Sequence, residues 1–134
     1  MFMTSQRTRG FTLVEILVVM VIVAILAAIA VPSYRQYVVR SNRSAAQSQM
    51  MDIANREQQF LLADRAYADK ATLVASGYVL TPEVSKFYTW NVVTPGGAAP
   101  SFQITLTPTG AQTSDGALTL DSQGNKAPID KWQR

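Results

Sequence analysis

The 134-residue chain contains neither cysteine nor histidine. Without cysteine there is no disulfide, no thiolate nucleophile and no cysteine-based metal site, so nothing in the chain depends on the redox compartment. Without histidine the chain lacks the usual general base at neutral pH and the commonest metal ligand. A glycine-rich phosphate loop is also missing, because Gly96-Gly97 lies in a proline-flanked turn with no lysine after it. We therefore expect neither catalysis nor a cofactor.

Net charge is low as well. The formal charge is +3, and it falls to +1 when Arg7 and Arg9 are removed, so the basic character comes largely from the first ten residues. A nearly neutral chain is not an obvious nucleic-acid binder. Basic residues also occur on both sides of the apolar segment described next, so their distribution does not set its orientation in a membrane.

One long apolar run dominates the first third of the chain. From Ile16 to Val31 no side chain is charged or strongly polar. Counted from Phe11 to Pro32, about twenty-one residues would extend roughly 31 Å as a helix, which is the thickness of the hydrocarbon core of a bilayer. A secretory signal peptide has a shorter apolar region that ends in its cleavage site. Here the plausible cleavage site, Gly10, precedes the run, so we expect a membrane-spanning helix that stays on the mature protein.

Glu15 is out of place in this segment. A lone carboxylate facing lipid costs several kcal/mol unless it finds a partner. One interpretation is a helix-start carboxylate at the membrane interface, stabilised by the helix dipole. The other is that Glu15 awaits a positive charge from another subunit, such as the amine that cleavage would create at Phe11.

The segment before the apolar run reads Arg7-Thr8-Arg9-Gly10-Phe11-Thr12-Leu13-Val14-Glu15. It resembles the class III signal of type IV prepilins and the related pseudopilins. The resemblance implies that a membrane-embedded aspartyl peptidase cuts between Gly10 and Phe11 and methylates Phe11. It also implies that Glu15 acts in assembly, and that the apolar run is first a membrane anchor and later the core of a fibre.

Beyond the run, Pro32 predicts a kink or local melting, because it lacks an N–H and its ring clashes with the preceding turn. The sequence then reads as helical again, and neither proline nor glycine occurs between Pro32 and Gly77. This predicts one helix of roughly fifty residues, apolar all round in its first half and amphipathic in its second. The apolar stripe of the second half comprises Tyr34, Tyr37, Val38, Ala45, Met50, Ile53, Phe60 and Leu61.

The last third of the chain predicts a sheet. Residues 64–86 read as a connecting region with one helical turn, and strands are expected at 87–93, 102–107 and 118–120, with a brief fourth strand before Pro128. An antiparallel sheet with one apolar face must cover that face, and the amphipathic half of the helix is the available partner. The predicted fold class is therefore α+β.

This order is similar to the type IV pilin fold, in which a long N-terminal helix, transmembrane in its first half, packs on a small antiparallel sheet. The expected divisions are a leader peptide over 1–10, a transmembrane and assembly helix over 11–38, and a globular domain over 39–134. Residues 37–43, 56–60 and 118–124 resemble PilE-like minor pilins, whose relatives include a DNA-uptake receptor pilin.

The chain departs from that branch at two positions. Its members usually carry one cysteine before the Gly-x-Leu-Thr-Leu strand and another before the final tryptophan, where this chain has Asp115 and Lys131. Their opposite charges would allow a salt bridge in place of the disulfide, and the other interpretation is two unrelated surface charges. An exposed pair would contribute only about 0–1 kcal/mol, so we expect Ile129 and Trp132 to hold the C-terminal segment.

Two other side-chain groups are candidate sites. Asp115, Asp121 and Asp130 could supply paired carboxylates or a calcium site, but their spacing matches no calcium loop, and solvated loop aspartates are expected. The C-terminal residues Lys126, Lys131, Trp132 and Arg134 form a small basic and aromatic cluster that is a weak candidate for binding DNA.

The sequence thus predicts a structural protein. The resemblance implies that the precursor is a prepilin in the inner membrane, single-pass with its N-terminus in the cytoplasm. It further implies that this prepilin is cleaved, N-methylated and polymerised into a surface fibre for adhesion, twitching motility or DNA uptake. Its expected partners are other pilin subunits, the prepilin peptidase and N-methyltransferase, and the inner-membrane assembly machinery. The alternatives are a type II secretion pseudopilin, and a minor pilin that binds DNA or a surface.

Overall fold

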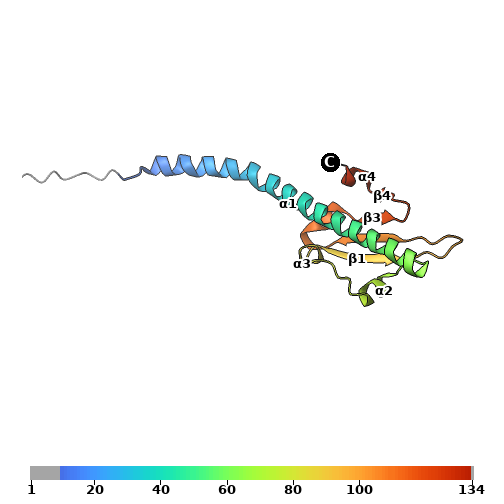
Figure 1. The fold of residues 1–134 in the computed structure, drawn as a ribbon. Helices are drawn as coiled ribbons and strands as arrows, with labels where there is room; N and C mark the ends of the chain where they lie inside the picture. The colour runs from blue at the N-terminus through green and yellow to red at the C-terminus, as the bar shows by residue number, and fades with distance from the viewer. Residues whose placement is uncertain (1–9, 134) are drawn as a thin grey trace, which may run out of the picture. The chain divides into compact units, whose positions relative to one another are not determined.

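The computed structural model describes residues 10–133. Their elements, in chain order, are the helices α1 (Leu13–Asp64), α2 (Lys70–Ala75) and α3 (Pro82–Ser85), the strands β1 (Tyr88–Val93) and β2 (Gln103–Pro108), the 3-10 helix η1 (Gly110–Asp115), the strands β3 (Leu118–Asp121) and β4 (Lys126–Ala127), and the helix α4 (Ile129–Trp132) (Figure 1). The chain divides into two compact units, one up to Tyr37 and one from Val38 onward, and α1 contributes to both.

The described part of the first unit is the N-terminal half of α1 and the residues just before it. Its apolar side chains are exposed throughout, and α1 is long and apolar enough to cross a membrane. The helix continues through Pro32, so the expected local melting does not occur there. Next to the proline, the Ser33 hydroxyl donates a hydrogen bond to the carbonyl oxygen of Ile29 at 3.1 Å.

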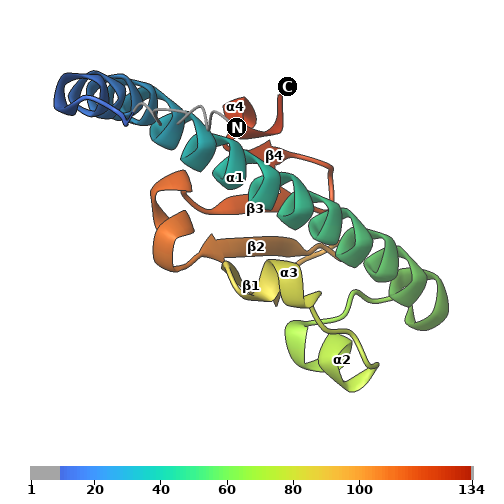
Figure 2. The ribbon, with the colours of Figure 1, turned by 90° about the vertical axis from the view of Figure 1, so that its left-hand side faces the viewer.

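The second unit contains a four-stranded antiparallel meander in the order β1-β2-β3-β4. The C-terminal half of α1 lies across one face of this sheet (Figure 2). The short helices α2 and α3 contact β1 at one edge, and α4 contacts β4 at the other. The β4 strand has the shortest pairing of the four, since it pairs with β3 only at Thr119↔Ala127 and Leu120↔Lys126.

The core lies between α1 and the covered face of the sheet. From α1 it takes Ala46, Met50 and Ile53, whose spacing places them on one side of the helix. The sheet supplies alternate residues of β1, β2 and β3, which are Tyr88, Val92, Ile104, Leu106, Leu118 and Leu120. Each large apolar side chain buried in this way contributes about 1.5–3 kcal/mol.

The predicted α+β fold and its long helix are confirmed, including the short fourth strand. The connecting region contains two short helices where one helical turn was expected. Asp69 starts the first of them, because its carboxylate accepts a hydrogen bond from the Thr72 amide at 2.9 Å. The 3-10 helix η1 was not expected at all.

Candidate functional site

The start of α1 is a reciprocal cap between Thr12 and Glu15. The Glu15 amide donates to the Thr12 hydroxyl oxygen at 3.1 Å, and the Thr12 amide donates to the Glu15 carboxylate at 3.5 Å. Thr-x-x-Glu is the spacing of a capping box, which satisfies two amides that a helix start leaves unpaired. Glu15 therefore has a partner within its own chain, a contact that the spacing could have predicted and that we missed.

Gly10 and Phe11 precede the first turn of α1. Both are exposed, and Phe11 is 80% exposed. The Gly10–Phe11 peptide bond is therefore outside the helix. The remainder of the expected leader, residues 1–9, lies outside the described residues, as does Arg134.

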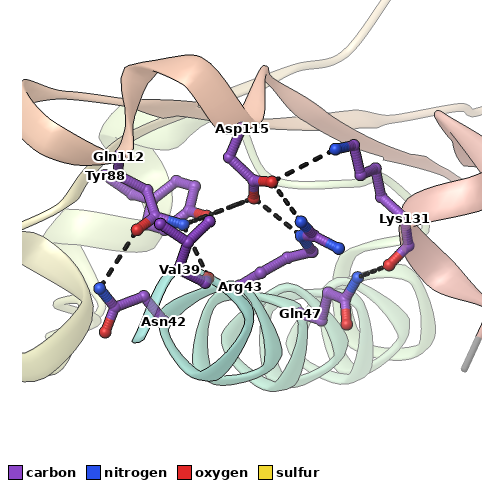
Figure 3. A network of polar contacts seen from close by, with 8 residues as sticks. All are labelled: Val39, Asn42, Arg43, Gln47, Tyr88, Gln112, Asp115 and Lys131. Carbon is purple, nitrogen blue, oxygen red and sulfur yellow. Dashed lines mark hydrogen bonds and ion pairs between the residues drawn. The ribbon is translucent and has the colours of Figure 1, made fainter. Parts of the chain in front are cut away.

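In the second unit, Asp115 is the centre of a polar network (Figure 3). It lies at the end of η1 and is only 5% exposed, so the expectation of a solvated loop aspartate is wrong here. Arg43 of α1 donates Nε–H to Oδ2 at 2.8 Å and also donates from Nη2 to Oδ1. Lys131 Nζ lies 3.4 Å from Oδ1. The structure thus brings Asp115 and Lys131 together and adds a bidentate partner, Arg43, that the sequence did not single out.

This arrangement keeps Asp115 ionised. Burial of the carboxyl group acts to raise the pKa of Asp115, but the hydrogen bonds and charges of Arg43 and Lys131 outweigh it, and the pKa lies below its ordinary value. The hydrogen bond to Asp115 in turn raises the pKa of Arg43. Both groups are charged across the physiological range.

Gln112 extends the network from η1 to α1 and β1. Its amide nitrogen donates to the Val39 carbonyl oxygen at 2.9 Å and to the Tyr88 hydroxyl at 3.0 Å. Its amide oxygen accepts from Asn42 at 3.2 Å. Burial raises the pKa of Tyr88 to about 12, so its hydroxyl stays protonated. These contacts satisfy a polar side chain that is almost completely buried.

The C-terminal segment is held differently from our expectation. Ile129 is 60% exposed, so its predicted role as an anchor is wrong. Trp132 is partly buried against the core, and its indole N–H donates to the Ala127 carbonyl oxygen at 3.4 Å. Gln47 of α1 donates to the Lys131 carbonyl oxygen at 2.8 Å. Polar contacts of Lys131 therefore supplement a single aromatic anchor.

Glu57 is a second buried carboxylate that sequence reasoning missed. It follows Met50 and Ile53 on the same side of α1 and is fully buried. One carboxylate oxygen accepts from the Ala68 amide at 2.8 Å, and the other has no partner among the described residues. Burial raises the pKa of Glu57 to about 7. The helical spacing alone was the signal that could have placed it in the core.

A pair of aromatic rings beside β1 has a cation at each end. The rings of Tyr78 and Trp90 meet edge to face with centroids 5.2 Å apart. The Arg56 guanidinium lies 5.0 Å from the Tyr78 centroid, and Lys70 Nζ lies 5.2 Å from that of Trp90. An open groove of about 320 Å³ is lined by residues that include Lys70, Tyr78 and Trp90. The predicted C-terminal cluster contains one comparable contact, with Lys126 Nζ 5.0 Å from the Trp132 ring.

Asp115, Asp121 and Asp130 occupy separate environments. Asp115 is paired as described above, and Asp121 accepts hydrogen bonds from the amides of Gln123 and Asn125, each at 2.9 Å. Asp130 is exposed in α4. Within residues 10–133 no three His, Cys, Asp or Glu side chains gather in a way that could hold a metal ion.

Two family profiles match the chain. One is described as "Type IV minor pilin ComP, DNA uptake sequence receptor" and matches residues 32–120. The chain belongs to this type IV minor pilin family. The other, "Prokaryotic N-terminal methylation motif", matches residues 5–31, which include Gly10, Phe11 and Glu15. The predicted pilin family is thereby confirmed.

Similar proteins include the type IV major pilin PilA of Myxococcus xanthus, 32% identical over 93 residues, or 69% of this pilin and 40% of the relative. The fimbrial protein EcpC of Eikenella corrodens is 38% identical over 98 residues, or 69% of this pilin and 64% of the relative. PilA4, the major component of the wide pilus of Thermus thermophilus, is 30% identical over 78 residues, with 58% and 60% covered. The pilin thus spans less than two thirds of the length of each.

Proposed function

We propose that this pilin is a non-catalytic structural subunit of a type IV pilus, anchored in a membrane and then polymerised through the N-terminal half of α1. The observation that carries the proposal is an exposed, uninterrupted apolar helix whose first part lies within the match to the methylation motif. So large an apolar surface needs lipid or other subunits to cover it. The relatives' names refer to pili and fimbriae, which favours a pilus subunit over a secretion pseudopilin.

In this proposal the chain crosses the inner membrane once, with its N-terminus in the cytoplasm. The prepilin peptidase cleaves between Gly10 and Phe11, the new amine is methylated, and the assembly machinery adds the subunit to the fibre. The exposure of Phe11, outside the first helical turn, supports access to that bond.

Glu15 would then bind the Phe11 amine of a neighbouring subunit. Its capping contact with Thr12 gives the carboxylate a partner before docking. In an apolar fibre core an ion pair avoids leaving two separate desolvated charges, so it can align subunits although a similar pair in water contributes little.

Three variants separate docking from capping. Glu15→Gln keeps a side chain that can accept the Thr12 hydrogen bond but has no charge, Glu15→Val loses both, and Thr12→Ala weakens the cap while keeping the charge. We expect both Glu15 variants to be cleaved normally and to be scarce in sheared pili, while Thr12→Ala remains abundant. Wild-type abundance of Glu15→Gln would show that Glu15 acts only as a cap.

DNA binding is the second candidate function, because the matching family is described as a DNA uptake sequence receptor. Lys70 and the partly exposed ring of Trp90 support it, since aromatic faces stack on bases and basic side chains contact phosphates. Tyr78 is buried and offers no face for stacking. The Asp52 carboxylate lies 3.3 Å from Nε of Arg56 and reduces the positive potential around Arg56. We therefore assign the stronger contribution to DNA binding to Lys70 and Trp90.

A mobility-shift titration of the full chain in detergent tests this assignment. Lys70→Gln should weaken binding and lower the slope of log affinity against log salt by about one unit, as expected for one lost phosphate contact. Lys86→Gln is the matched control. Equal losses in the two variants would mean that any DNA binding is spread over the surface.

A further inference from the structure

The last described residues, 126–133, comprise β4 and α4 and lie along the outer edge of β3. We call them the C-terminal strap. We propose that the strap opens as a unit while the rest of the second unit stays folded, and that the ion pair between Lys131 and Asp115 controls how often it opens.

The strap has little apolar attachment. No residue of α4 is buried, and both residues of β4 are exposed. Ile129 is turned to solvent, and Trp132 alone is packed against the core. Burial of apolar surface is the main force that holds a segment in place, so this segment depends unusually on its polar contacts.

Those polar contacts converge on Lys131. Its carbonyl oxygen accepts from Gln47 of α1 at 2.8 Å, and its ammonium group lies 3.4 Å from Asp115. Pairing with β3 adds only the two positions of β4. Figure 3 shows Lys131 reaching the side of Asp115 that Arg43 also contacts.

Opening leaves no unpaired charge in the interior. Asp115 keeps its bidentate contact with Arg43 when Lys131 departs, and the Lys131 side chain is already 28% exposed. Losing the last partner of a buried carboxylate is strongly destabilising, whereas losing the weaker of two partners is not. The strap can therefore detach without disrupting the network beneath it.

The turn before the strap provides a defined boundary for this motion. Asp121 accepts hydrogen bonds from the amides of Gln123 and Asn125, and its own amide donates to the Asn125 carbonyl oxygen at 3.1 Å. Gly124 sits in the left-handed region that this turn requires. The turn is complete without residues 126–133, so opening begins after Asn125 and makes β3 the edge strand.

Hydrogen–deuterium exchange on the full chain in detergent micelles tests the proposal. In the wild type, amides of the strap should exchange faster than those around Met50 and Ile53, and raising salt should speed the strap further by screening the ion pair. Lys131→Met, which keeps the length of the side chain, should speed strap exchange about two- to fivefold without changing the core. It should also abolish the effect of salt on the strap.

Two controls make the outcome decisive. Lys86→Met removes a lysine that forms no ion pair within the described residues and should leave the strap unchanged. Arg43→Met should speed exchange in the core as well as the strap, because Asp115 then loses its principal partner. The proposal is overturned if strap and core amides exchange together in the wild type, or if Lys131→Met leaves strap exchange at the wild-type rate.

Discussion

Glu57 and Asp115 are both buried carboxylates of the second unit, yet their pKa values move in opposite directions. Asp115 faces two cations, one of them bidentate, and remains ionised. Glu57 has a single backbone donor, Ala68, and the nearby charge of Asp69 raises its pKa further. Partners, and not burial alone, decide which of the two carries a charge.

Glu57→Gln should flatten the pH dependence of stability above pH 5. The folded-state pKa of Glu57 is raised to about 7, so its favourable contribution is full below the ordinary value and is lost as pH rises through about 7. Wild-type stability should fall over that range with a slope of up to about 1.4 kcal/mol per pH unit from this group. Glutamine keeps the acceptor for Ala68 without the charge. Thermal melts at pH 5 and pH 8 measure the effect, and an identical fall in both proteins would contradict it.

Asp115 and Lys131 should show measurable coupling in a double-mutant cycle of Asp115→Asn and Lys131→Met. Charge reversal is unsuitable, because a lysine at position 115 would face Arg43. Asp115→Asn should cost about 3–5 kcal/mol, as expected when a buried pair is broken, and Lys131→Met about 1 kcal/mol or less. If the two losses of stability add in thermal melts of the double variant, the 3.4 Å contact contributes nothing to stability.

Asp115 should also affect stability in acid. Its pKa is lowered on folding, so its contribution is present above the ordinary value of the carboxyl group and is lost as pH falls through the folded value. Wild-type stability should therefore drop below about pH 4, more steeply than that of Asp115→Asn. Melts at pH 6 and pH 3 check this difference.

At the scale of elements, the periodic spacing of apolar residues predicted the long helix and the strands. The apolar stripe and the absence of glycine predicted α1 through Asp64, and alternation predicted the strands of the sheet. The segment Gly110–Asp115 has no such pattern, and its burial depends on Arg43 and Val39, which are distant in the sequence. The Asp115–Lys131 contact was reached through the family's cysteine positions, and no local pattern in this chain pointed to Arg43 as its main partner.

A separate prediction concerns the segment before α1. Gly10→Val should block maturation, because a β-branched side chain next to the Gly10–Phe11 bond obstructs its approach to the peptidase. Mass spectrometry of membrane fractions should find an uncut chain without methylated Phe11. Gly97→Val, in the loop between β1 and β2, is the matched control and should be cleaved normally. Normal cleavage of Gly10→Val would refute this placement of the site.

At the scale of the whole molecule, the two units depend on different environments. The second unit, from Val38 onward, has its own core and an ionic network in place of any disulfide. The apolar helix of the first unit has no core, and its side chains are exposed along its length. Its stability therefore comes from the surrounding lipid, detergent or neighbouring subunits, and that of the second unit from internal packing.

The two units should consequently unfold separately in detergent micelles. Trp90 and Trp132 both belong to the second unit, so tryptophan fluorescence reports on that unit alone. Heating should produce one fluorescence transition accompanied by a partial loss of helical circular dichroism. The signal of the apolar helix should persist, because no water is present in the micelle interior to replace its backbone hydrogen bonds. Ile53→Ala should lower the transition temperature, since removing a buried side chain costs about 2–5 kcal/mol, while leaving the residual helical signal unchanged. Loss of all helical signal within the fluorescence transition would show that α1 unfolds with the sheet and that its apolar half has no independent stability in an apolar environment.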